Sequence, residues 1–276
     1  MIFIIQVILE NIKAHFLLKK ILNDICNGDL FGCIEVDIEV KDDAKHKYNE
    51  YPPFFVTCEV SKDLIREHMT DYCNKNDINF KTKKLLLSGL KAGKILLATP
   101  LLNWYLNHDC NVTRIYQIIE FTPNRCFEGF IDKVTKYRVL GDKHPDMSIL
   151  GACYKLISNS SYGSLLMDKS KHTNIKYLSD IGSVSSIINS PNFKDIEEFE
   201  NNLYEVETFK SLINIDNPIQ IWFFILEYAK LRMLQFYFDC LIKYLKPKSF
   251  ELIETETDNL YMALNQENLE MCINLN

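Results

Sequence analysis

Apolar and acidic side chains alternate along residues 30–40, LFGCIEVDIEV, and this alternation predicts a half-buried β-strand. Successive side chains of a strand point to opposite faces, so the apolar positions from Ile34 to Val40 would lie against a core. The opposite face would carry Glu35, Asp37 and Glu39. Such a face can bind a metal ion or can simply be solvated. The pattern therefore predicts a strand with one buried and one polar face.

The other patterns mix helices and strands without a regular β-α-β order. Helical periodicity is typical of residues 2–26, 61–72, 100–107, 126–138, 147–166 and 218–244. Strands are predicted for residues 54–60 and 112–121, and a strand–turn–strand unit for residues 250–264. Residues 173–190 have no regular pattern. This mixture predicts an α+β fold.

Composition limits the class of protein. The chain has 276 residues, of which 47% are hydrophobic and 25% charged, so a sizeable core is expected and disorder is not. The net charge of -6 argues against nucleic acid when taken alone, because phosphate binding needs clustered cations. The nine cysteines form no CxxC pair, so we expect reduced thiols rather than zinc ligands or disulfides.

The apolar start of the chain, residues 1–9, is too short to cross a bilayer. It also has no basic flank and no small-residue cleavage site, so we expect neither a membrane partner nor a signal peptide. A nuclear or cytoplasmic location is therefore expected.

Residues 154–163, YKLISNSSYG, place three chemically useful side chains on one face of a predicted helix. Lys155, Asn159 and Tyr162 are spaced i, i+4 and i+7. A cation, an amide and a phenol in one row can contact a phosphate, a sugar edge and a base. The alternative is a partly exposed helix that ends at Gly163.

Residues 254–259, ETETDN, form the acidic turn of the predicted strand–turn–strand unit. Carboxylates at such a turn can hold Mg²⁺, which prefers oxygen ligands. The alternative is a solvated acidic turn. The six histidines are dispersed and are not expected to be metal ligands, and no serine-hydrolase, zinc-protease or phosphate-loop motif is present.

In this order, the segments resemble the palm and fingers of protein-primed family B DNA polymerases, which occur in linear plasmids, some phages, adenoviruses and Polinton or Maverick transposons. Residues 155–163 fit the fingers motif K-x-x-x-N-S-x-Y-G at every fixed position. Residues 256–259, ETDN, are similar to the D-T-D-S motif of the palm hairpin. The resemblance spans residues 27–267.

The resemblance implies four segments. Residues 1–29 would be an N-terminal helical segment. Residues 30–130 would be palm with the insertion that, in this family, contacts the priming protein and the DNA. Residues 131–168 would be the fingers. Residues 169–276 would be palm with the catalytic hairpin, ending before the thumb.

The activity implied is that of a DNA-directed DNA polymerase, which transfers a nucleotide from a dNTP to a primer or protein hydroxyl with two Mg²⁺ ions. Asp258 would bind metal together with Glu256, and Lys155 would contact the triphosphate. Asn159 and Tyr162 would line the nucleotide pocket, and Arg138 would contact a phosphate. The implied partners are a DNA template–primer, dNTPs and a terminal (priming) protein.

Two departures from the family pattern bear on activity. The motif D-x-x-S-L-Y-P, which supplies the first palm carboxylate, does not occur in residues 1–29, and Glu256 and Asn259 replace aspartate and serine in the palm hairpin. We therefore expect impaired polymerase activity in this chain. The alternatives are a non-catalytic remnant that only binds DNA, nucleotide or a partner protein, and an unrelated α+β scaffold whose two motifs arise by chance.

Overall fold

The chain folds into two compact units, described here from a computed structural model. Unit 1 consists of residues 1–124 and 224–276, and unit 2 of residues 125–223. The structure describes residues 5–7, 15–79, 81–199, 202–246, 248–256 and 259–273. Both units combine helices with antiparallel sheets, so the predicted α+β class is confirmed.

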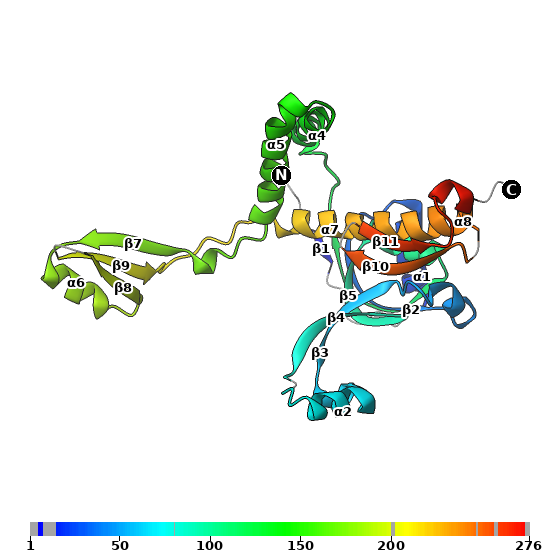
Figure 1. Ribbon diagram of the computed structural model, residues 1–276, viewed down its shortest axis with the longest axis horizontal. Coiled ribbons are helices and arrows are strands. Elements are labelled where there is room, and N and C mark those ends of the chain that lie inside the picture. Colours follow the sequence, from blue (N-terminus) through cyan, green and yellow to red (C-terminus); the bar gives the residue numbers. More distant parts are fainter. Residues whose placement is uncertain are drawn as a thin grey trace. The chain divides into compact units, whose positions relative to one another are not determined.

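Unit 1 is built on a four-stranded antiparallel sheet with strand order β1-β6-β2-β5 (Figure 1). Its strands are β1 (Ile5–Val7), β2 (Gly32–Val40), β5 (Lys91–Ala98) and β6 (Cys110–Glu120). The central strand β2 confirms the predicted half-buried strand, since Ile34, Val36, Ile38 and Val40 are buried. The acidic residues between them are partly exposed.

Helices from distant parts of the sequence complete the core of unit 1. They are α1 (His15–Asn27), α3 (Thr99–Asn107) and the part of α7 (Ile219–Leu234) from Phe224 onward; the short helix α8 (Ile242–Tyr244) follows and buries no residue of its own. Between α7 and α8 the helix widens into a π-helical turn, Gln235–Leu241. Buried side chains of these helices join the apolar face of the sheet in one cluster: Ile21, Ile25, Leu101, Leu102, Leu234, Tyr237 and Leu241. Each fully buried side chain of this size contributes about 1.5–3 kcal/mol.

Two further pairs of strands belong to unit 1. β3 (Phe54–Val60) and β4 (Lys83–Gly89) form a ribbon, and α2 (Glu67–Lys75) lies at its end (Figure 1). β10 (Phe250–Glu256) and β11 (Asn259–Leu264) form the hairpin expected for residues 250–264. Short 3₁₀ turns lie at Asp42–Tyr48, Lys62–Leu64 and Leu269–Cys272.

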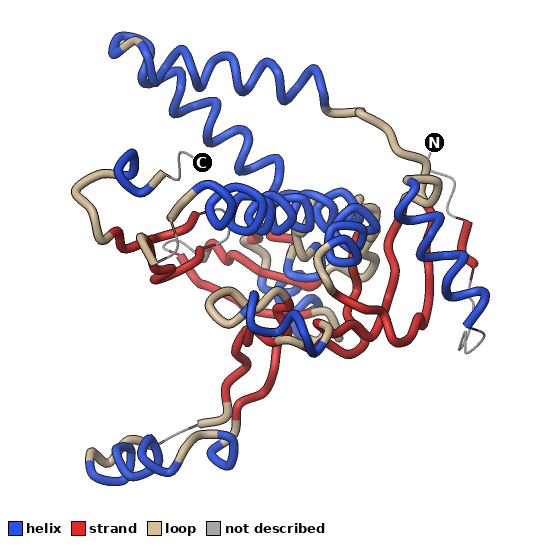
Figure 2. Tube along the Cα trace, turned by 90° about the vertical axis from the view of Figure 1, so that its right-hand side faces the viewer, coloured by secondary structure: helices blue, strands red, loops and turns tan. Residues whose placement is uncertain are grey.

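Unit 2 contains a helical hairpin and a small sheet. Helices α4 (Glu128–Lys143) and α5 (Ser148–Ser164) lie side by side, joined by a 3₁₀ turn at Pro145–Met147 (Figure 2). After a 3₁₀ turn at Lys169–Lys171, the chain forms a three-stranded antiparallel sheet with strand order β7-β9-β8 and a helix. These elements are β7 (Thr173–Leu178), α6 (Ile181–Ile188), β8 (Phe193–Phe199) and β9 (Leu203–Phe209).

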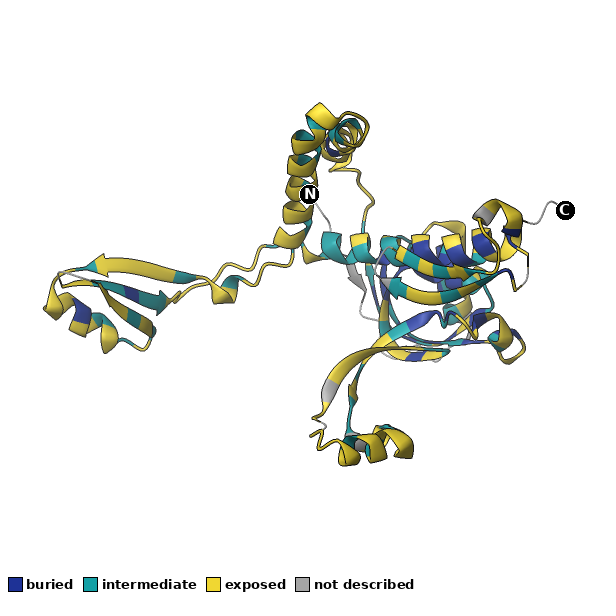
Figure 3. Ribbon diagram, in the orientation of Figure 1, coloured by how far each residue is buried: buried dark blue, intermediate teal, exposed yellow. Residues whose placement is uncertain are grey.

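The two units differ in how much side chain they bury (Figure 3). Most of the buried residues belong to unit 1. Within the described part of unit 2, the buried hydrophobic residues are Val134, Val184 and Val206. No helix among the described residues is both long and apolar enough to cross a membrane.

Some sequence expectations are wrong in detail. Residues 2–26 do not form one helix, because residues 5–7 are the strand β1 and α1 starts only at His15; residues 8–14 lie outside the described part. Pairing of β1 with β6 overrides the local periodicity. The helix expected over residues 61–72 is a 3₁₀ turn followed by α2, because Ile65 is extended with ψ 148°.

Two other segments are also revised. α4 ends five residues later than the predicted helix 126–138, at Lys143. The segment 173–190, without a regular pattern in sequence, forms β7 and α6. Its short strand becomes ordered by pairing with β9, about thirty residues further along the chain, and a local pattern does not report such a contact.

Candidate functional site

The row of side chains predicted on residues 154–163 lies on α5. The helix runs from Ser148 to Ser164 and therefore contains Lys155, Asn159 and Tyr162. Lys155 and Asn159 are exposed, and Tyr162 is half-buried. Among the described residues, no hydrogen bond or ion pair engages the Lys155 ammonium or the Asn159 side-chain amide. Both polar groups are therefore available to an anionic or polar ligand.

Tyr162 differs from the two polar residues because its ring has a partner. It stacks on Trp222, with ring centroids 6.2 Å apart and an interplanar angle of 24°. Trp222 belongs to the first turns of α7, which begins in unit 2. Aromatic contacts of this kind stabilise by about 0.5–1.5 kcal/mol beyond area burial. Tyr162 is thus held in place at the C-terminal end of the Lys155 face.

Arg138 lies in the second half of α4, where it is exposed. Its predecessor Tyr137 stacks on Tyr154, the residue before Lys155, with ring centroids 4.5 Å apart and an interplanar angle of 11°. The stacked rings therefore join α4 and α5, and each of the two tyrosines is followed in sequence by a cationic residue, Arg138 or Lys155. Unit 2 brings Arg138 and Lys155 to corresponding levels of α4 and α5.

The palm-like residues belong to unit 1. β10 ends at Glu256, β11 begins at Asn259, and these two residues are backbone partners. Thr257 and the predicted metal ligand Asp258 lie outside the described residues, and of Glu256 only the backbone is described. The strands β10 and β11 thus form a hairpin whose last described pair is Glu256 and Asn259.

The residue types of this hairpin suit the metal ion that the resemblance implies. Carboxylates occur at positions 254, 256 and 258, with an amide at Asn259 and no cysteine or histidine. Mg²⁺ prefers such oxygen ligands. Among the described residues, which do not include Asp258, no group of three or more His, Cys, Asp or Glu side chains is arranged to hold a metal ion.

The acidic face of β2 makes protein contacts. The Asp37 carboxylate accepts hydrogen bonds from the backbone N–H of Lys94 and from the hydroxyl of Tyr116, both at 2.8 Å. Glu39 forms an ion pair with Lys91 at 2.5 Å. Of the two interpretations of this face, its contacts favour a polar surface, because each of these carboxylates already has a donor or a cation beside it.

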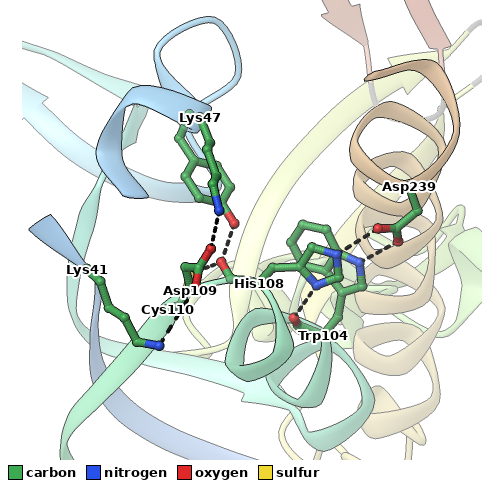
Figure 4. Close-up of polar contacts among 8 residues, drawn as sticks. Lys41, Lys47, Trp104, His108, Asp109, Cys110 and Asp239 are labelled. Carbon is green, nitrogen blue, oxygen red and sulfur yellow. Dashed lines mark hydrogen bonds and ion pairs between the residues drawn. The ribbon is translucent and has the colours of Figure 1, made fainter. Parts of the chain in front are cut away.

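A polar cluster that the sequence does not reveal lies where α3 ends (Figure 4). The imidazole of His108 contacts the carboxylate of Asp239 through Nε2, at 2.7 Å, and the backbone oxygen of Trp104 through Nδ1, at 2.8 Å. The indole N–H of Trp104 donates to the other oxygen of Asp239, at 2.9 Å, and its ring stacks on the imidazole. Asp239 thereby fixes α3 to the π-helical turn.

Asp109 continues this cluster at the surface (Figure 4). It adopts a positive φ of 60° and forms an ion pair with Lys47 at 2.6 Å. The hydrogen bond from Lys47 holds the pKa of the Asp109 carboxyl below its usual value. Tyr48 donates a hydrogen bond to the backbone oxygen of His108. With every polar group engaged, the cluster is structural.

The spacing of Trp104 and His108, four residues apart on a helix, is a signal for their contact that sequence reasoning can use. Asp239 carries no comparable signal, since it is 135 residues from Trp104.

Comparison with known proteins found no match. No protein-family model matches this chain, and no curated protein and no solved structure matches it.

Proposed function

We propose that this chain is the palm and fingers part of a protein-primed family B DNA polymerase, which transfers nucleotides from dNTPs to a primer or protein hydroxyl on a DNA template. The observation that carries the proposal is the free, exposed row of Lys155 and Asn159 on α5, which ends at the packed ring of Tyr162. The residues of this row fit the fingers motif at every fixed position. Support also comes from a β-hairpin around residues 256–259.

In this function Lys155 binds the triphosphate of the incoming nucleotide, because an ammonium without an acidic partner can neutralise phosphate oxygens. Asn159, one turn further along α5, offers an amide to the sugar or base. Tyr162 supplies a fixed phenol face beside the base, and Arg138 a second cation for phosphate. Asp258 and Glu256 would hold Mg²⁺, which when bound stabilises the charge of the transferring phosphoryl group.

Nucleotide binding tests the role of α5 directly. Lys155→Gln should raise the dissociation constant of a dNTP, measured by titration calorimetry in Mg²⁺, by at least about tenfold, since a charge-assisted hydrogen bond contributes about 1.5–3 kcal/mol. Lys143→Gln removes another exposed lysine, at the end of α4, and is the matched control. Equal binding by both variants would contradict the assignment of Lys155.

Primer extension with Mg²⁺ and dNTPs tests the whole activity. Because Glu256 and Asn259 replace the aspartate and serine of the palm motif, we expect slow extension that is abolished by Asp258→Ala. Rapid extension would contradict the expected impairment while supporting the polymerase assignment. DNA binding without any nucleotide binding would instead favour a non-catalytic remnant, for which the altered ETDN motif is the supporting observation. Absence of both would favour an unrelated scaffold.

A further inference from the structure

Glu50 connects three parts of unit 1 that are far apart in sequence. One of its carboxylate oxygens accepts a hydrogen bond from the hydroxyl of Tyr237, at 2.6 Å. The other oxygen accepts a hydrogen bond from the backbone N–H of Leu252, at 2.5 Å. The donors lie 187 and 202 residues away, in the π-helical turn and in β10. Glu50 lies two residues after the 3₁₀ turn Asp42–Tyr48, in an exposed position. This surface segment therefore contacts both the π-helical turn and β10.

The contact with Leu252 occurs where β10 leaves its regular pairing. The register between β10 and β11 shifts between Leu252 and Glu254. Such an irregularity interrupts the ladder of backbone hydrogen bonds and bends the strand. The hairpin has only two strands, which are marginally stable without further contacts. The Glu50 carboxylate therefore supplies a hydrogen-bond acceptor at the position where the strand pairing of the hairpin is interrupted.

The hydrogen-bond donor of the second contact, Tyr237, is buried. Its side chain is 1% exposed. Burial and the neighbouring Glu50 carboxylate raise the pKa of Tyr237, which keeps its hydroxyl protonated and able to donate. The ring of Tyr51, next to Glu50 in sequence, packs edge-on against Tyr237 with centroids 5.1 Å apart. Phe250 of β10 contacts the same ring at 6.2 Å.

We propose that Glu50 is a positioning residue, whose carboxylate holds the β10–β11 hairpin on the π-helical turn and thereby sets the position of the strand end that leads to Glu256 and Asp258. The consequence for Asp258 rests on the proposed function. From Leu252 to Glu256 the strand extends about 13 Å, at about 3.3 Å per residue, so a change at the anchor is carried to the turn. Each carboxylate oxygen accepts one of the two hydrogen bonds, whereas an amide at position 50 would have only one acceptor oxygen.

Hydrogen exchange measured by mass spectrometry tests the anchor without reference to activity. Glu50→Gln should accelerate exchange of the amides in β10 and β11 by about tenfold, and leave β2 and β6 at the wild-type rate. Glu59→Gln, which removes an exposed carboxylate of β3 paired with Lys84 at 3.8 Å, is the matched control. Tyr237→Phe should act in the same direction, and the double variant should add less than both single changes combined. Unchanged exchange in Glu50→Gln would overturn the assignment.

Binding of Mn²⁺, followed by its electron paramagnetic resonance signal, tests the consequence for the metal site. We expect the dissociation constant to rise at least about fivefold in Glu50→Gln, to stay unchanged in Glu59→Gln, and to rise most in the reference variant Asp258→Asn. Faster hairpin exchange with unchanged Mn²⁺ affinity would overturn the positioning role. If the wild-type chain itself bound no Mn²⁺, the proposed function would fail, and the exchange result would still decide whether Glu50 anchors the hairpin.

Discussion

Glu227 is a carboxylate inside unit 1, 1% exposed, on α7. One oxygen accepts a hydrogen bond from the backbone N–H of Ala98, at 3.1 Å, and the other forms an ion pair with Lys230, at 2.8 Å. Ala98 is the last residue of β5 and immediately precedes α3. One side chain thus joins α7 to the sheet and to the start of α3.

Glu227→Ala should lower the free energy of unfolding by about 2–4 kcal/mol, because it leaves the Ala98 N–H buried without an acceptor and opens a cavity. Glu227→Gln keeps the volume and one acceptor oxygen and should cost about half as much. Urea denaturation followed by tryptophan fluorescence measures both. The exposed change Glu59→Ala should stay within about 0.5 kcal/mol of wild type. An equally small effect of Glu227→Ala would show that the contact contributes little.

The thiol of Cys33 is a buried group that makes stability depend on alkaline pH. Burial, with a smaller contribution from the charge of Glu227, raises the pKa of this thiol from 9.0 to about 12. The folded protein therefore retains the proton that the unfolded chain loses. The stabilisation is complete below pH 9 and is lost as the pH rises from 9 toward 12.

Between pH 9 and 11, the unfolding free energy of wild type should fall more steeply than that of Cys33→Ala, by about 1.4 kcal/mol per pH unit. Denaturant titrations at several pH values measure the two slopes. Cys153→Ala changes an exposed thiol and should keep the wild-type slope. Identical slopes for wild type and Cys33→Ala would mean that Cys33 is accessible to water in the folded state.

Local sequence patterns predict the exposed row on α5, because helical spacing alone puts Lys155, Asn159 and Tyr162 on one face. They do not predict Glu227 or Glu50, whose hydrogen-bond donors lie 129 and 187 residues away. The residues next to an acidic side chain in sequence do not show whether its carboxylate is a buried hydrogen-bond acceptor or is solvated. The tertiary contacts alone make that distinction.

The helical hairpin of unit 2 depends on two glycines at its closed end. A Cβ atom on Gly141 of α4 would lie 2.6 Å from the Cα of Gly151 of α5, and one on Gly151 would lie 3.0 Å from the Cα of Gly141. The backbones of the two helices are therefore in direct contact. Absence of a side chain here allows α4 and α5 to meet so close to their connecting turn.

Gly141→Ala should destabilise the hairpin by about 1–3 kcal/mol, since the new methyl group meets backbone atoms that cannot move independently. Gly129→Ala, on the same helix, has no atom within 4 Å of the added Cβ and should stabilise by up to about 1 kcal/mol through helix propensity. Amide exchange within residues 128–164 measures both. Equal effects in the two variants would contradict a close contact at Gly141.

Strands that have one clearly buried face can be predicted from the sequence. Strands of a sheet that buries few side chains are harder to predict. The alternation of apolar and acidic residues predicts β2, and the apolar residues on both sides of an acidic turn predict the β10–β11 hairpin. β8 carries charged residues on both of its faces, and β9 carries two glutamates on one face and a single buried residue, Val206, on the other. These short sequences resemble solvated loops. β1 pairs with β6 although its residues continue a helical periodicity.

The two units of the whole molecule are stabilised to different degrees. Unit 1 has one contiguous core, to which the sheet, α1, α3 and the π-helical turn contribute. Unit 2 is held by stacked rings, a glycine contact and a few buried valines. Regions with few buried apolar contacts open at lower free energy than a core.

Native-state hydrogen exchange should therefore divide along the boundary between the units. Amides of β2 and β6 should exchange slowest, and those of α4, α5 and β7–β9 at least about 100-fold faster relative to unstructured reference rates. Mass spectrometry of peptides from both units measures the difference. Equal protection of β2 and α5 would contradict the difference in stability.

Unit 1 is interrupted in sequence by unit 2, and this interruption has a consequence for synthesis on the ribosome. The sheet residues up to 124 are made first, but the core also needs side chains of residues 231–245, which follow unit 2. At about 5–20 residues per second, translation of the roughly 100 residues between the two parts takes about 5–20 s. During that time the apolar face of the sheet lacks its final cover, and a chaperone that binds nascent chains has an exposed surface to bind.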